Sequence, residues 1–171
     1  MHILLTNDDG VQAPGLLALS QALRPLGKVS LLAPDRNWSA SGHVKTLERP
    51  LRVHHVLLAD GTPALSSDGA PSDCVALALL GIIPEPIDMV VSGINPNANF
   101  GHDVTYSGTV TAAIEGAIAG LPAVAVSLDR PENFNGQVDY GPTAQVARRV
   151  IEAILAHNTP EATLLNVNVP Y

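Results

Sequence analysis

Two adjacent carboxylates, Asp8 and Asp9, stand just after a short apolar run at residues 3–5. A run without polar alternation is typical of a strand buried on both faces, as in a parallel sheet. Ligands of open α/β sheets bind beyond the carboxyl ends of such strands. Neighbouring carboxylates repel each other unless a positive charge lies close by, and a hard divalent cation would supply it. A polar turn in which one aspartate caps the next helix explains the same residues, so the pair alone leaves both interpretations open.

Oxygen donors also follow two later apolar runs. Ser39 and Ser41 come after the run at residues 29–33, and Asn95 follows the run at residues 87–92. Because the carboxyl ends of parallel strands meet at one edge of a sheet, we expect these side chains to lie near the paired aspartates. Two carboxylates, a hydroxyl and an amide oxygen suit Mg²⁺, Mn²⁺ or a similar cation, with water and a substrate oxygen as further ligands.

A third feature is a Ser-Gly-Thr run at residues 107–109, which opens a helix of small residues. Free N–H groups and the helix dipole make such a start a site for a phosphate dianion. Together with the cation site, this pattern predicts a metal-assisted hydrolase or a phosphate-binding protein. The candidate substrate or phosphate ligands are Ser107, Gly108 and Thr109 at the helix, Ser41 and Gly42 in the second loop, and Asn7, which either orients Asp8 or caps a turn.

The elements that must position these residues alternate along the chain. Core strands are predicted at residues 3–5, 29–33, 87–92, 123–128 and 163–169, and helices at 14–26, 70–80, 110–120 and 142–157. Residues 44–68 are less regular, and short strands at 45–47, 51–58 and 64–66 predict a β-hairpin insert beside the main sheet. The alternation predicts a three-layer α/β/α Rossmann-like domain with a mostly parallel sheet.

Composition narrows the class of protein. At 171 residues, of which 46% are hydrophobic, the chain suits a single domain over residues 1–171 with a substantial core. The net charge of −7 gives no basic footprint for a nucleic-acid polymer. One cysteine excludes an internal disulfide framework. No signal peptide is visible, and no apolar run approaches the roughly 18 residues of a membrane span, so a soluble cytoplasmic protein is expected.

Several motifs, in order from residue 3 to residue 170, resemble the SurE family of stationary-phase survival nucleotidases. A single Asn-Asp-Asp-Gly would be a weak signal, but the set together is highly specific. The matching segments are residues 6–10 (TNDDG), 13–15 (APG), 33–37 (APDRN) with Ser39, 91–95 (VSGIN), 103–110 (DVTYSGTV), 125–128 (AVSL) and 166–170 (NVNVP).

The resemblance implies a metal-dependent acid phosphatase acting on nucleoside 5′- and 3′-monophosphates, with some members also trimming polyphosphate. It implies one divalent ion per subunit, ligated by Asp8, Asp9, Ser39 and Asn95, which are among the oxygen donors selected above on chemical grounds. In such a mechanism the ion neutralises charge on the phosphate, residues 107–109 hold other phosphate oxygens, and one aspartate takes the proton of the attacking water. A homodimer or homotetramer is also expected.

The chain departs from the family pattern at two places. Ala70 stands where a threonine is usual, and Pro96 and Asn97 follow Asn95 where a glycine is common. Family members also continue past the Val-Pro at residues 169–170, through a hairpin that resembles a subunit-exchange arm. The expected assembly depends on that further segment.

Other residues near the predicted site have structural explanations. His43 and His102 are interpreted as solvated loop histidines rather than as an acid or base. Trp38 either stacks on a nucleobase or packs against the protein. Tyr106 is expected to pack rather than to act in catalysis, and Cys74 is expected in the core.

Four other classes of protein could explain parts of this pattern. A response-regulator receiver and a haloacid-dehalogenase-type phosphatase both need a lysine late in the chain, whereas the lysines here are Lys28 and Lys45. A dinucleotide-binding oxidoreductase would show Gly-x-Gly-x-x-Gly after the first strand, where this chain has Asp8, Asp9 and Gly10. A non-catalytic nucleotide or metal sensor on the same scaffold stays open.

Overall fold

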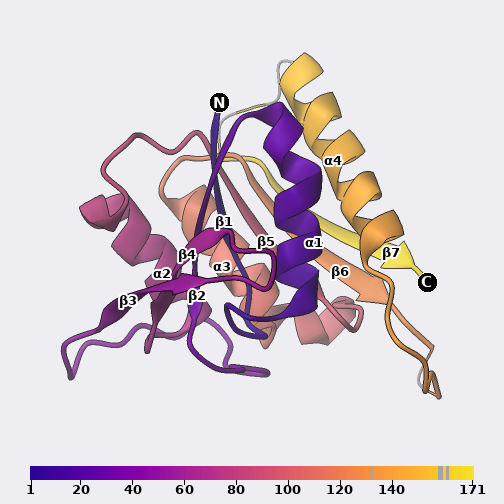
Figure 1. The fold of residues 1–171 in the computed structure, drawn as a ribbon, viewed down its shortest axis with the longest axis horizontal. Helices are drawn as coiled ribbons and strands as arrows, with labels where there is room; N and C mark the ends of the chain where they lie inside the picture. Colours follow the sequence, from indigo (N-terminus) through magenta and orange to yellow (C-terminus); the bar gives the residue numbers. More distant parts are fainter. Residues whose placement is uncertain (132, 158–159, 161) are drawn as a thin grey trace.

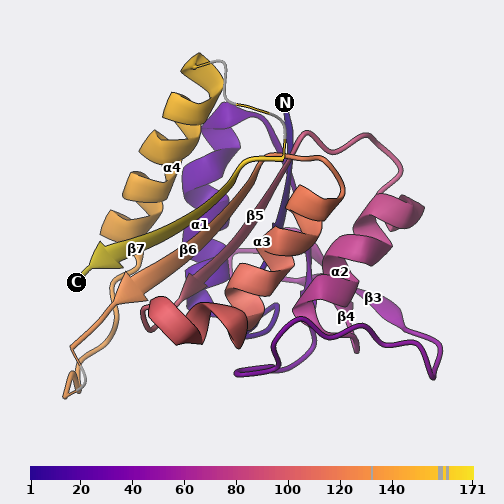
Figure 2. The ribbon, with the colours of Figure 1, turned by 180° about the vertical axis from the view of Figure 1, so that it is seen from behind.

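The computed structural model describes residues 1–131, 133–157, 160 and 162–171. It contains a seven-stranded sheet of order β3-β4-β2-β1-β5-β6-β7, with helices on both faces (Figures 1 and 2). Every neighbouring pair of strands is parallel except β3 and β4, which run antiparallel. The predicted three-layer α/β/α fold with a mostly parallel sheet is therefore confirmed.

The bounds of the elements follow the predicted alternation. The strands are β1 (His2–Thr6), β2 (Lys28–Pro34), β3 (Val53–Leu57), β4 (Pro63–Ser67), β5 (Met89–Asn95), β6 (Ala123–Asp129) and β7 (Leu164–Pro170). The helices are α1 (Pro14–Leu23), α2 (Pro71–Leu77), α3 (Gly108–Ile118) and α4 (Gly141–Ala156), with short turns η1 (Arg24–Leu26), η2 (Ala78–Ile82) and η3 (Gly101–Thr105).

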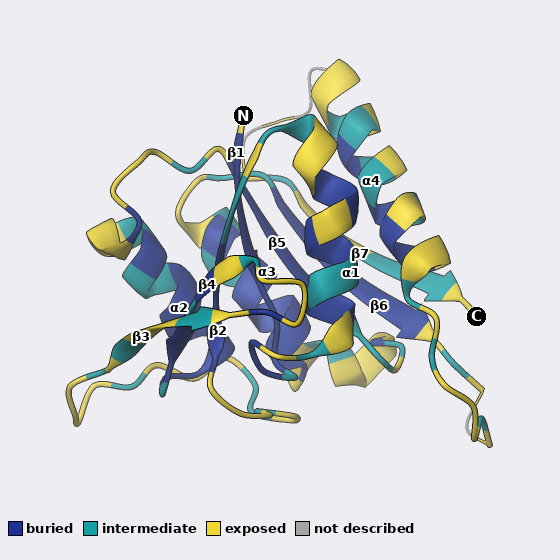
Figure 3. Cartoon of the chain, in the orientation of Figure 1, coloured by how far each residue is buried: buried dark blue, intermediate teal, exposed yellow. Residues whose placement is uncertain are grey.

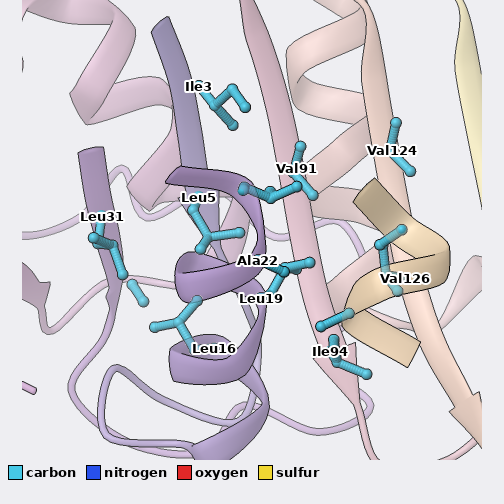
Figure 4. Packing of buried hydrophobic residues seen from close by; sticks show 14 of the residues in the cluster. Ile3, Leu5, Leu16, Leu19, Ala22, Leu31, Val91, Ile94, Val124 and Val126 are labelled. Atoms are coloured by element: carbon cyan, nitrogen blue, oxygen red, sulfur yellow. The ribbon is translucent and has the colours of Figure 1, made fainter. Parts of the chain in front are cut away.

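The core consists of two apolar layers, one on each face of the sheet. Ile3 and Leu5 of β1 pack with Leu16 and Leu19 of α1, and all four side chains are fully buried (Figure 4). Leu4 points the opposite way, because side chains alternate along a strand, and it packs in the layer under α2 and α3. Figure 3 shows the result, with the central strands buried and exposed residues on the outer sides of the helices.

The insert at residues 44–68 differs in part from its prediction. Its hairpin, β3 and β4, is present and extends the main sheet, since β4 pairs in parallel with β2. The strand predicted at residues 45–47 is wrong, because no strand forms there. Side chains of the α2 start hold this segment instead: the Thr46 N–H and hydroxyl donate to the two Asp73 oxygens at 3.0 and 2.7 Å.

The first two helices, α1 and α2, are shorter than predicted. The helix predicted over 14–26 ends at Leu23, because Pro25 lacks an N–H, and the chain continues as the 3₁₀ turn η1. The helix predicted over 70–80 ends at Leu77 and passes into the wider turn η2. Among the described helices, none combines the length and apolar character that a membrane crossing requires.

Candidate metal centre

The aspartate pair lies in a tight turn closed by Asn7. The Asn7 side chain is fully buried. Its Nδ2 donates to the Gly10 carbonyl at 2.9 Å, and the Gly10 N–H donates back to Asn7 Oδ1 at 3.2 Å. Both ends of the amide are thus used by the turn, and Asn7 is not among the residues that line the neighbouring cleft. Of the two roles predicted for Asn7, these bonds are those of a residue that caps the turn carrying Asp8 and Asp9.

Asp8 is held between the first two loops and the start of α3. Its carboxylate is 4% exposed, and Oδ1 accepts a hydrogen bond from the Thr109 hydroxyl at 2.5 Å. Its backbone carbonyl accepts from the Trp38 N–H at 2.7 Å, which ties the loop after β2 to the loop after β1. Burial raises the pKa of Asp8, and the hydrogen bond from Thr109 partly opposes that rise.

Asp9 is the less buried of the pair. Burial, and after it the charge of Asp8, raises the pKa of Asp9 to about 7. Among the described residues, none forms a side-chain hydrogen bond or ion pair with its carboxylate, so repulsion from Asp8 is not offset by a protein cation. Asp9 does not line the cleft described next. The pKa of Tyr140 is raised mainly by burial and then by the charge of Asp9.

A cleft of about 230 Å³ opens at the carboxyl ends of β1, β2 and β5. Three of the four predicted cation ligands line it, each from a different loop, and the start of α3 closes one side. The lining residues are Asp8, Ser39, Ala40, Asn95, Asn97, Ala98, Asn99, Asp103, Tyr106 and Ser107.

Ser39 and Asn95 both present oxygens that have no donor in the described part of the protein. The Ser39 hydroxyl donates to Asn37 Oδ1 at 2.6 Å, so its lone pairs are left to accept. Asn95 Nδ2 donates to the Asn97 carbonyl at 2.5 Å, which leaves Oδ1 to accept. A carboxylate, a hydroxyl oxygen and an amide oxygen on one cleft, with a second carboxylate adjacent in sequence, form a donor set that fits a hard divalent cation.

The predicted phosphate ligands divide into two groups. Ser107 lines the cleft and caps α3, where its Oγ accepts from the Val110 N–H at 3.2 Å. Gly108 and Thr109 lie behind Asp8: a Cβ on Gly108 would come within 2.7 Å of Asp8 Cβ, and the Thr109 hydroxyl is used by Asp8. The absence of a side chain at Gly108 is what lets the helix start approach the carboxylate so closely.

Ser41 and Gly42 lie outside the lining of the cleft and fasten the second loop to α3. The Gly42 N–H donates to the Tyr106 carbonyl at 2.9 Å, and the Gly42 carbonyl accepts from the Thr111 hydroxyl at 3.0 Å. The Ser41 hydroxyl is buried without a hydrogen-bond partner among the described residues. The two residues shape the loop that carries Ser39.

The structure adds residues that sequence reasoning missed or misplaced. Asn97, Asn99 and Asp103 line the cleft without having been selected. The prediction that Tyr106 packs is wrong, because it lines the cleft and is 64% exposed. The sequence signal was an aromatic residue inside the 103–110 motif, between the predicted cation and phosphate ligands.

The other residues considered near the site do not line the cleft. The Arg36 guanidinium lies 4.8 Å from the centre of the Trp38 ring, so one face of the indole is covered. His43 Nε2 lies 2.9 Å from Glu115 Oε2, away from the cleft. His102 is exposed and does not line it. Cys74 is buried as predicted, and burial raises the pKa of its thiol.

Comparison with known proteins gives a consistent result. The profile described as "Survival protein SurE" matches residues 3–171. The chain is 54% identical to the 5′-nucleotidase SurE of Herpetosiphon aurantiacus and 51% identical to that of Chloroflexus aggregans, each match covering 99% of this chain and 66% of the relative. The SurE protein of Aquifex aeolicus, a solved structure, has a TM-score of 0.85 and 41% identity, over 99% of this chain and 66% of that one.

The chain thus spans 66% of the length of these relatives. The matches cover 99% of this chain, so they include the loops that form the cleft. With its parallel sheet, its paired aspartates and its donor-lined cleft, the chain belongs to the SurE family.

Proposed function

We propose that this chain carries the site of a divalent-metal-dependent phosphatase that hydrolyses nucleoside 5′- and 3′-monophosphates to nucleoside and phosphate, with short polyphosphate as a further substrate. One observation carries the proposal: Asp8, Ser39 and Asn95, from three separate loops, line a single cleft beside the start of α3. The relatives are named 5′-nucleotidase SurE, which supports the choice of a nucleotide substrate.

The residues Asp8, Asp9, Ser39 and Asn95 would hold one Mg²⁺ or Mn²⁺ ion. When bound, such an ion supplies positive charge that polarises a phosphate oxygen and stabilises charge in the transition state. The four oxygen donors are neutral or anionic, and no lysine or arginine among the described residues lines the cleft to neutralise them.

The chain's own residues orient the phosphate and move a proton. The Ser107 hydroxyl, which lines the cleft at the N-terminus of α3, would face the phosphate oxygens at the positive end of the helix dipole. Thr109 holds Asp8 in one orientation. The attacking water forms the new P–O bond, one of the two aspartates accepts its proton, and the ester P–O bond breaks as the nucleoside oxygen takes up a proton.

The test is Asp8→Asn, measured as phosphate released from a panel of nucleoside monophosphates with and without Mn²⁺ or Mg²⁺. We expect metal-dependent release to be lost, because the amide cannot replace a buried anionic ligand. Glu152→Gln is the matched control, since it neutralises an exposed carboxylate on α4 that pairs with Arg148. Near-normal turnover in Asp8→Asn would defeat the assignment, and binding without turnover in the unaltered protein would indicate a sensor instead.

A further inference from the structure

Asn99 is fixed by four hydrogen bonds to the ends of β6 and β7. Its backbone N–H donates to Asn168 Oδ1 at 2.8 Å. Its carbonyl accepts from Asn166 Nδ2 at 2.9 Å and from Asn168 Nδ2 at 3.3 Å. Its side-chain Nδ2 donates to Ser127 Oγ at 2.7 Å. Asn99, a residue of the cleft wall, is therefore bonded to both β6 and β7.

The Asn168 side chain bonds to the Asn99 backbone in the way that a neighbouring strand would. Its side-chain amide both accepts from and donates to the backbone of Asn99, as a neighbouring peptide group would in a sheet. Asn99 is 7% exposed, so its backbone groups would lack partners if the amide were removed. A buried polar group left unpaired is costly, and the turn would be expected to move rather than leave it so.

The anchoring point lies in register with a cation ligand. Asn95 pairs with Ser127 across β5 and β6, and Ser127 pairs with Asn168 across β6 and β7. Asn99 bonds to the last two members of this row, while Asn95, its first member, is a predicted ligand. The turn of residues 95–99 is thus fastened at both ends over one row of the sheet, and four of its five residues line the cleft.

The identity of the two strand residues also needs an explanation. Asparagine is depleted in strands, and β7 carries it at positions 166 and 168, both on the same face. Val167 and Leu165 point to the opposite face, against the core under α1 and α4. Hydrogen bonding to Asn99 is the use that the structure gives to both amides.

We propose that Asn168, assisted by Asn166, is a positioning residue of the metal site. Its amide sets the place of the 95–99 turn and through it the place of the Asn95 oxygen. The inference rests on the proposed function only where phosphate release is measured. Measurement of Mn²⁺ binding tests it without that assumption.

The experiment measures Mn²⁺ binding to the whole chain by calorimetry, with thermal unfolding and the kinetics of phosphate release alongside. Asn168→Ala is expected to weaken Mn²⁺ binding about 10-fold, in the range found when groups that orient metal ligands are removed. Asn166→Ala removes one donor and should have a smaller effect of the same sign. Asn168→Asp keeps the acceptor, but its carboxylate repels the Asn99 carbonyl, and it should resemble the alanine variant.

Val169→Ala is the matched control, because it shortens a side chain of the same strand on the opposite face. It should lower the melting temperature without changing the affinity for Mn²⁺. Unchanged Mn²⁺ binding in Asn168→Ala, or an equal loss in Val169→Ala, overturns the proposal. If Asn168→Ala does not fold, Asn166→Ala and Asn168→Asp decide by the same measurement. Mn²⁺ binding without turnover in the unaltered protein would refute the phosphatase and leave this test intact.

Discussion

Tyr106 presents an aromatic face to solvent at the cleft where phosphate is proposed to bind. It is 64% exposed, and its backbone is held by the hydrogen bond from the Gly42 N–H. Trp38, the other aromatic residue of these loops that was considered for stacking, has one face covered by Arg36. Tyr106 is therefore the residue best placed to stack on the base of a nucleotide.

We expect Tyr106→Ala to raise KM for AMP about 10-fold, since stacking on one base contributes about 1–3 kcal/mol. Ribose 5-phosphate, which has no base, should be hydrolysed as before. Tyr106→Phe keeps the ring and serves as the control. Steady-state kinetics with both esters checks this, and an equal loss on both would assign Tyr106 to the phosphate site or to folding.

At the scale of elements, α3 connects the site to the sheet through two glycines. Gly108 lies against Asp8, and a Cβ on Gly116 would come within 2.6 Å of a Val90 methyl carbon in β5. The first contact concerns a predicted ligand and the second only the packing of the helix. The two positions therefore separate site geometry from stability within one element.

Gly108→Ala should weaken Mn²⁺ binding by at least about 10-fold, because the added methyl group must displace the Asp8 side chain, an effect comparable to disturbing a ligand's support. Gly116→Ala should cost about 1–3 kcal/mol of unfolding free energy through overpacking and leave Mn²⁺ affinity unchanged. Calorimetric titration and thermal unfolding of both variants test the pair. A loss of affinity in Gly116→Ala would contradict the separation.

The elements show how far sequence could predict this structure. Apolar runs predicted the central strands β1, β5 and β6, because a strand covered on both faces needs little else to define it. The strand predicted at residues 45–47 was wrong because Asp73, from a later helix, supplies the hydrogen bonds that a neighbouring strand would have supplied. Such a partner, distant in sequence, leaves no local signal.

The candidate site could be predicted to a similar degree. Asp8, Ser39 and Asn95 follow strand ends, so topology alone brings them to one edge of the sheet. Asn99 could not be selected, because its place in the wall depends on Asn168, a residue 69 positions away. The structure gives the positions of the predicted ligands, and the roles assigned to all of them stay predictions.

At the scale of the whole molecule, the aspartate pair links stability to pH and to metal. The pKa values of Asp8 and Asp9 are raised above 3.8 in the folded protein. The folded state without metal therefore binds more protons than the unfolded state between about pH 4 and pH 7. Its stability contribution from these groups is complete below about pH 4 and is lost as pH rises through about 7.

A divalent ion binds the deprotonated pair, so its stabilising effect should grow with pH. Excess Mn²⁺ at about 100 times its Kd should add about 2.7 kcal/mol, or about 5–10 °C, at pH 8 and much less at pH 5. Asp9→Asn should raise the melting temperature of the metal-free protein at pH 8 and shrink the response to Mn²⁺. Scanning calorimetry at both pH values provides the measurement, and equal shifts at pH 5 and pH 8 would contradict the linkage.

Assembly and location belong to this scale as well, and both stay predictions. A homodimer or homotetramer and a cytoplasmic location are what the family resemblance and the composition lead us to expect. The mass of the protein in solution, measured by light scattering after size-exclusion chromatography, tests the first.

The row that joins Asn95, Ser127 and Asn168 bears on any attempt to transplant this centre. A graft of only the four proposed ligands onto another parallel sheet would carry the oxygen atoms without the residues that position them. The graft would have to include β6 and β7, even though neither strand supplies a donor. The smallest portable unit is therefore a section across the sheet rather than a set of loops.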